Sequence, residues 1–129
     1  MTSRSDAFAL LSAKLAPFGY PIAWPHINFT PPDTGIWLEV MVFDNDPLQD
    51  FIANDGPVLS TGFLQVTVFD RPGRGSLPAD TAAQAVIAAL PKGTRIGTSA
   101  RVNRHPYRMS EDDTTGDKLA VPVTIPYGP

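Results

Sequence analysis

Hydrophobic residues recur with a period of two in three segments of the chain, a pattern typical of β-strands. The segments are IWLEVMVF (36–43), GFLQVTVF (62–69) and KLAVPVTIPY (118–127). The first is apolar on both faces, so that strand is either central or covered on one side by another subunit. In the third, Pro122 and Pro126 share one parity and remove backbone donors on one side only, which predicts an edge strand with that side unpaired.

Two other segments carry apolar residues at the helical spacing of three and four. Residues 4–15 predict a helix that Pro17 and Gly19 end, and residues 80–90 predict a second one that ends before Pro91. The apolar stripe of the first is Phe8, Leu11, Leu15 and Phe18, and that of the second is Ala83, Val86, Ile87 and Leu90. A longer strand is expected over 96–107. This order predicts one α+β domain over 1–129, a small twisted, mostly antiparallel mixed sheet with two helices packed on one face.

Composition narrows the possible functions. The chain has 129 residues, is 43% hydrophobic and carries a net charge of −3, which gives enough material for one core and no general attraction to nucleic acid. With no cysteine and two histidines, disulfides and thiol chemistry are excluded and neither a metal nor a cofactor is expected. No apolar run is long enough to span a membrane, and the N-terminus does not resemble a secretion signal. We therefore expect a cytosolic, soluble domain.

The stretch VTVFDRPGRGSLPAD (66–80) runs from a strand through glycines into a helix, the order found in phosphate-binding loops. It lacks the lysine and spacing of a P-loop, and Pro78 stands where a dinucleotide-binding turn needs a third glycine. Pro78 also lacks the backbone N–H that a phosphate would accept from. The favoured interpretation is a turn that exposes Arg71 and Arg74, and a small anion-binding enzyme is kept as the rival from another class.

Other candidate chemistry is weaker. Asp44, Asp46 and Asp50 suggest calcium, but Pro47 interrupts the order of ligands in an EF-hand loop, so these aspartates are interpreted as turn formers or helix caps. No serine lies in a nucleophile-elbow pattern, so no catalytic residue is assigned. Glu39 shares a strand face with Trp37 and Met41, where a carboxylate satisfied at an interface is the commoner explanation.

Two features indicate association with other proteins. Aromatic and apolar residues exceed what one small sheet and two helices would bury, including Trp24 and Phe29. The segment RVNRHPYR (101–108) is basic, and alternation divides its arginines between the two faces of the strand. We favour a solvated strand end there, then a subunit contact, and nucleic acid last. The interface residues predicted from these features and the Gly-Arg loop are Trp37, Met41, Phe43, Arg71, Arg74, Arg101, Arg104 and Tyr107.

The order of these elements resembles the tail terminator family of long-tailed bacteriophages and prophages. The resemblance rests on the N-terminal helix RSDAFALLSAKLAPF, the segment PIAWPHINFTPP and the strand motif WLEV, followed by TGFLQVTVFDRPGRG, an alanine-rich helix and the closing AVPVTIPY. It implies a twisted mixed sheet flanked by helices, six copies of which assemble into a ring.

The resemblance also implies a function. Such a ring sits on the head-proximal end of the tail tube in the virion, ends tube polymerisation and presents a docking surface to the head-side connector, with the genome passing through its lumen. The implied partners are other copies of the chain, the tail tube protein and the connector protein, and no catalysis is implied. Another neck, connector or tube-like component is the main alternative, and a plain oligomeric module without a phage role is a further one.

Overall fold

The computed structural model describes residues 4–25, 27–32, 35–44, 61–71, 77–97, 100–108 and 119–128. Its strands are β1 (Ile22–Ala23), β2 (Trp37–Asp44), β3 (Gly62–Asp70), β4 (Arg95–Ile96), β5 (Ala100–Val102), β6 (Tyr107–Arg108) and β7 (Leu119–Gly128). They form one sheet in the order β1-β2-β3-β7-β5-β4, and β6 also pairs with β7. The β1–β2 pair is parallel and the other pairs are antiparallel, which confirms the predicted mixed sheet.

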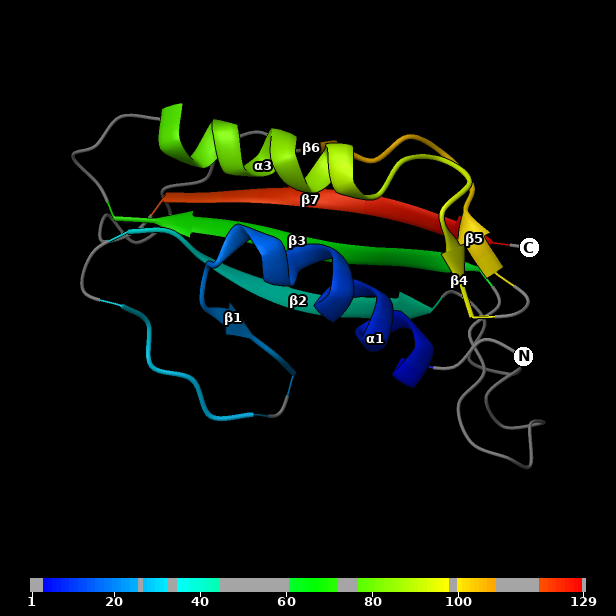
Figure 1. Cartoon of the computed structure of the whole chain (residues 1–129), viewed down its shortest axis with the longest axis horizontal. Helices are drawn as coiled ribbons and strands as arrows, with labels where there is room; N and C mark the ends of the chain where they lie inside the picture. The colour runs from blue at the N-terminus through cyan, green and yellow to red at the C-terminus, as the bar shows by residue number, and fades with distance from the viewer. Residues whose placement is uncertain are drawn as a thin grey trace.

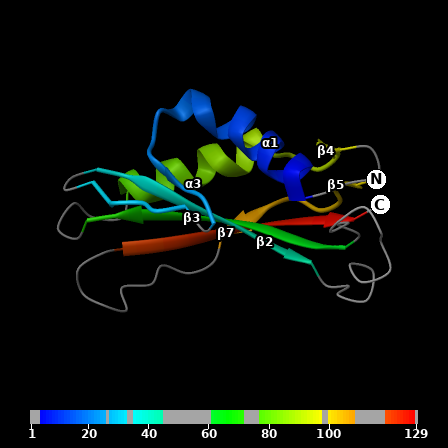
Figure 2. The same ribbon diagram turned by 90° about the horizontal axis from the view of Figure 1, so that it is seen from below.

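Two α-helices, α1 (Arg4–Leu15) and α3 (Leu77–Ala89), lie on the same face of this sheet, as predicted (Figures 1 and 2). The core lies between them and the sheet. From α1 it takes Ala7, Leu11 and Leu15, all fully buried, whereas Phe8 and Phe18 of the predicted stripe are only partly buried. From the strands it takes the residues of one parity, among them Leu38, Val40, Leu64, Val66, Val68, Val121, Val123, Ile125 and Tyr127.

The ends of the helices follow local backbone chemistry. A short 3-10 turn, η1 (Ala16–Phe18), extends α1 and ends at Gly19, whose φ of 74° is the left-handed conformation that glycine adopts easily. Helix α3 begins at Leu77, three residues before the predicted start, with Pro78 in its first turn. Proline is tolerated there because the first N–H groups of a helix have no partner within it.

The prediction that the C-terminal segment is an edge strand is wrong. Strand β7 pairs with β3 along its length and with β5 and β6 on its other side. The N–H of Asn103 donates to the carbonyl of Pro126. The backbone hydrogen-bonding groups of Pro126, and of the β7 residues that alternate with it, therefore face β5 and β6. Pro122 and Pro126 therefore do withhold donors on one side only, but two short strands occupy that side with a break between them.

The long strand predicted over 96–107 is also wrong, because this region contains the three short strands β4, β5 and β6. Of the predicted division of arginines between faces, Arg101 and Arg108 are observed on opposite faces, whereas Arg104 lies between strands. Arg108 lies on the helix side, where it forms an ion pair with Asp80 of α3. Arg101 lies directly opposite Gly128 and Tyr107 directly opposite Thr124, which places both on the other face.

Candidate subunit interface

No described helix covers the second face of the sheet, which we call the open face. Two aromatic pairs lie on it, each formed by residues directly opposite one another on β2 and β3. Trp37 stacks on Phe69 with ring centroids 5.3 Å apart, and Phe43 stacks on Phe63 at 4.7 Å. Stacked cross-strand aromatics stabilise a sheet pair, so these rings fix the register of β2 against β3 at both ends of the ladder.

Between the two aromatic pairs, β2 presents Glu39 and Met41 on the open face, opposite Thr67 and Gln65 of β3. Both β2 side chains are exposed, and Met41 keeps 42% of its surface accessible. The open face is thus apolar at its ends and mixed in the middle. A flexible thioether next to aromatic rings is typical of a surface that contacts another protein.

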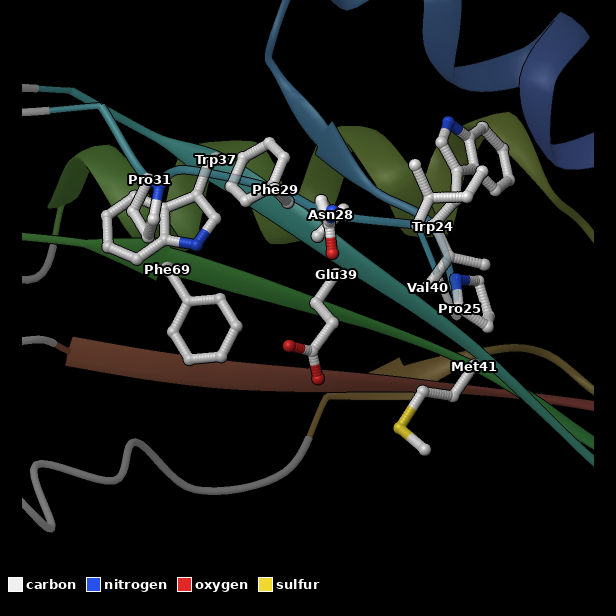
Figure 3. Close-up of a pocket in the computed structure, with 12 residues that line it drawn as sticks. Trp24, Pro25, Asn28, Phe29, Pro31, Trp37, Glu39, Val40, Met41 and Phe69 are labelled. Carbon is white, nitrogen blue, oxygen red and sulfur yellow. The ribbon is translucent and has the colours of Figure 1, made fainter.

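A groove of about 550 Å³ runs along β2 where the segment 24–31 borders the open face. Figure 3 shows residues of its lining, with Glu39 and Met41 projecting from β2 and Asn28, Phe29 and Pro31 on the segment that runs beside this strand. Trp24 of the 24–31 segment is anchored by an edge-to-face contact with Phe8 of α1, at a centroid distance of 6.0 Å. Helix α1 therefore positions one wall of the groove, although it lies on the other side of the sheet.

Arg71, directly after β3, holds the segment of this wall in place through hydrogen bonds to Pro32. Its Nε and Nη2 atoms both donate to the carbonyl oxygen of Pro32, at 3.2 and 2.7 Å. Its guanidinium lies over the Trp37 ring, 4.9 Å from the ring centroid. The prediction that Arg71 hangs in solvent is wrong: its side chain is half-buried and connects three segments of the chain.

Replacing Arg71 with lysine is expected to lower the free energy of unfolding by about 1–2 kcal/mol, because an ammonium cannot match the two-pronged bond and the stacking of a guanidinium. The backbone amides of residues 27–30 should then exchange hydrogens faster. Urea unfolding and hydrogen exchange measure the two effects. Arg104→Lys is the matched control, since Arg104 is exposed and has no ion pair among the described residues. Equal effects of both variants would contradict the role assigned to Arg71.

The structure brings together some of the predicted interface residues. Trp37, Met41 and Phe43 share the open face of β2, but Trp37 is only 4% exposed, so the surplus aromatic surface is partly covered within the chain itself. Arg101 of β5 and Tyr107 of β6 lie on the same face, both on strands that pair with the outer side of β7, and both are exposed. Arg104 is exposed between β5 and β6 and borders a hollow of about 270 Å³ with Tyr107.

Several earlier candidates lie outside the described residues. These are Arg74 and the possible calcium residues Asp46 and Asp50. Within the part of the chain that is described, no group of three His, Asp or Glu side chains is placed to hold a metal ion. No described helix is both long and apolar enough to cross a membrane.

Sequence reasoning missed two parts of this surface. One is the segment 27–31, whose role as a wall depends on contacts with β2 and with Arg71, 39 residues away from Pro32 in the chain. Its prolines indicate only an extended path. The other is Arg95, which β4 places directly opposite Arg101. Strand β4 has only two residues, so no alternation of polar and apolar residues could reveal it in the sequence.

Comparison with known proteins decides the family. The sequence profile of the phage tail terminator proteins matches residues 6–127, nearly the whole chain and every described strand and helix apart from the two ends. The chain belongs to the phage tail terminator family. The fold has a counterpart among solved structures, with a TM-score of 0.68 and 24% sequence identity over 98% of this chain and 95% of the other. Among curated proteins, none is significantly similar in sequence.

Membership in the family gives this chain a structural role in a phage tail, as a virion component that interacts with other tail components. The resemblance stated from the sequence is thereby confirmed at the level of the family. The solved counterpart supports the arrangement of the sheet and helices and nothing further, because the two sequences differ at most positions. For a terminator, the open face and its groove are surfaces available for contacts with neighbouring proteins.

Proposed function

We propose that this terminator forms a hexameric ring on the head-proximal end of the tail tube, where it ends tube polymerisation and provides the docking surface for the head-side connector. The observation that carries the proposal is the family match over residues 6–127. In this proposal the chain is not an enzyme, and the genome passes through the lumen of the ring. Its place is the neck of the virion, after assembly in the host cytoplasm.

The open face supports a ring built by one repeated contact. A head-to-tail contact uses two unlike patches of each subunit and closes into a ring when the rotation between subunits allows it. The groove beside β2 and the exposed β4–β5 end of the sheet are two such unlike patches, at opposite ends of the strand order. Met41, Phe43 and the edge of the Trp37 ring are proposed to lie in subunit contacts.

The basic residues are proposed to divide between two tasks. Arg74, outside the described residues, and the loop that carries it are proposed to contact the tube or the connector. Arg71 is tied to Pro32 and Trp37, so its contribution to docking is the shape of this loop. Reversing the charge of Arg71 would break that contact as well, and Arg74→Glu is therefore the cleaner variant for testing docking.

The test is a tube-capping experiment. The purified chain is expected to form hexamers by size-exclusion chromatography with light scattering, either alone or on tubes. When it is added to polymerising tail tube protein, tube growth should stop, and labelled copies should be found at a single tube end by electron microscopy. Arg74→Glu should fold normally and cap less well. A chain that stays monomeric with and without tubes, and leaves tube length unchanged, would overturn the proposal.

A further inference from the structure

Opposite charges lie on the open face at the two ends of the sheet. Glu39 of β2 is exposed near one end, and Arg95 of β4 and Arg101 of β5 are exposed at the other. All three point to the open face, because their neighbours in the strands, such as Leu38, Ile96 and Val102, are buried on the helix face. The sheet thus carries an acidic patch and a basic patch on one surface.

The two arginines are placed unfavourably in an isolated chain. They lie directly opposite one another in the β4–β5 pair, where two like charges destabilise a ladder. No carboxylate among the described residues forms an ion pair with either of them; the one described ion pair joins Arg108 to Asp80 on the helix face. A carboxylate from outside the chain would relieve this repulsion.

Glu39 is a carboxylate that lacks a cationic partner among the described residues. It borders a groove walled by Trp37, Phe69 and the 24–31 segment. A guanidinium suits such a site because it can bind the carboxylate and stack on an aromatic ring. This chain already shows the second contact once, where the guanidinium of Arg71 lies over Trp37.

Glu39 and Arg101 cannot meet within one chain. Across the sheet Glu39 aligns with Thr67 and then Pro122, whereas Arg101 aligns with Gly128. Pro122 and Gly128 lie about 20 Å apart along β7 at the rise of an extended strand, and three strand spacings separate Glu39 from Arg101 across the sheet. Among the described residues, the two patches therefore cannot pair with each other within one chain, and a second molecule can supply the partner of each.

We propose that the groove beside Glu39 binds the Arg95–Arg101 edge of a neighbouring copy of the same chain, so that this charge pair fixes the head-to-tail register of the ring. The proposal rests on the ring proposed above and specifies which two edges meet. A second copy is favoured over nucleic acid because both complementary patches belong to this chain, whose net charge is −3. It is favoured over another tail protein because one contact between two unlike edges, repeated, closes a ring.

The test is a charge swap between two variants. Glu39→Arg alone and Arg95→Glu/Arg101→Glu alone should each weaken assembly about tenfold or more in the concentration needed for hexamers, because like charges then face each other at every contact. Mixing the two variants should restore hexamers that contain both chains, since every contact in an alternating ring again joins opposite charges. Native mass spectrometry measures the composition, and increasing salt should weaken the wild-type ring.

A control matched to the arginine variant carries the same change in net charge as Arg95→Glu/Arg101→Glu, but on exposed helix positions: Lys14→Glu/Thr81→Glu/Gln84→Glu, all three exposed. It should assemble as the wild type does. If wild type forms hexamers and caps tubes but the charge variants assemble equally well, this inference is overturned and the proposed function stands. If the arginine variant assembles normally and loses binding to double-stranded DNA, the basic edge lines the lumen instead and the inference is also overturned.

Discussion

Replacing Leu11 with alanine is expected to lower the free energy of unfolding by about 3 kcal/mol, a large part of the 5–15 kcal/mol that typically holds a domain folded. Leu11 is fully buried, between Ala7 and Leu15 on the core side of α1. The substitution removes apolar area from the core and leaves a cavity that the sheet, fixed by its ladders, cannot close. Because α1 also contacts α3 and β4, the loss should extend beyond one helix.

Leu77→Ala is the matched control for this prediction. It makes the same chemical change at the first residue of α3, where the side chain is 73% exposed, and should change stability by a few tenths of a kcal/mol at most. Urea unfolding monitored by circular dichroism compares the two variants. Equal losses would show that α1 does not pack on the sheet as described, and would weaken the case for Trp24 as an anchored wall of the groove.

Much of this fold could be predicted from the sequence because its long strands and helices show a clear period of apolar residues. The three long strands alternate cleanly, so their bounds were predicted to within a residue and their faces correctly. In β2, for example, Leu38 and Val40 are buried on the helix face and Met41 is exposed on the other, as the alternation of the strand predicts. Helices with an apolar stripe must cover the apolar face of the sheet, which explains why their placement was also predictable.

The misplaced elements depend on partners that the sequence does not reveal locally. The parity of Pro122 and Pro126 shows on which side β7 lacks donors, but not that β5 and β6 fill this side around the prolines. Trp37 looked like exposed aromatic surface because the side chains that contact its ring, Phe69 and Arg71, come from a distant part of the chain. Short strands and long-range contacts of this kind leave little trace in a hydrophobic pattern.

The candidate interface was predictable in kind and not in geometry. The apolar second face of β2 indicated association, and Glu39 on that face was interpreted as an interface carboxylate. What the sequence could not supply was the groove, since its two walls come from β2 and from the 24–31 segment. Nor could it supply the opposition of Arg95 and Arg101, which exists only once β4 has folded back on β5.

Trp37→Ala is expected to lower the free energy of unfolding by about 3 kcal/mol, as truncation of a buried large aromatic residue does. The side chain is 4% exposed. Its ring stacks on Phe69, and the guanidinium of Arg71 also lies over it. Its loss removes part of the wall of the groove together with the support of Arg71. Because the same groove is proposed to receive the neighbouring subunit, hexamer formation should fail at concentrations where wild type assembles.

Two comparison variants separate stability from assembly. Trp37→Phe keeps a ring to stack on Phe69 and under Arg71, and should cost less than about 1.5 kcal/mol, so that any loss of hexamers by this folded variant reports on the contact surface. Arg74→Ala should affect both unfolding and hexamer formation less than Trp37→Ala does, because buried apolar area dominates contacts between subunits. Chemical unfolding and light scattering on the same samples measure both quantities. Negligible effects of Trp37→Ala in both would remove Trp37 from the core of the β2–β3 pair and from the proposed interface together.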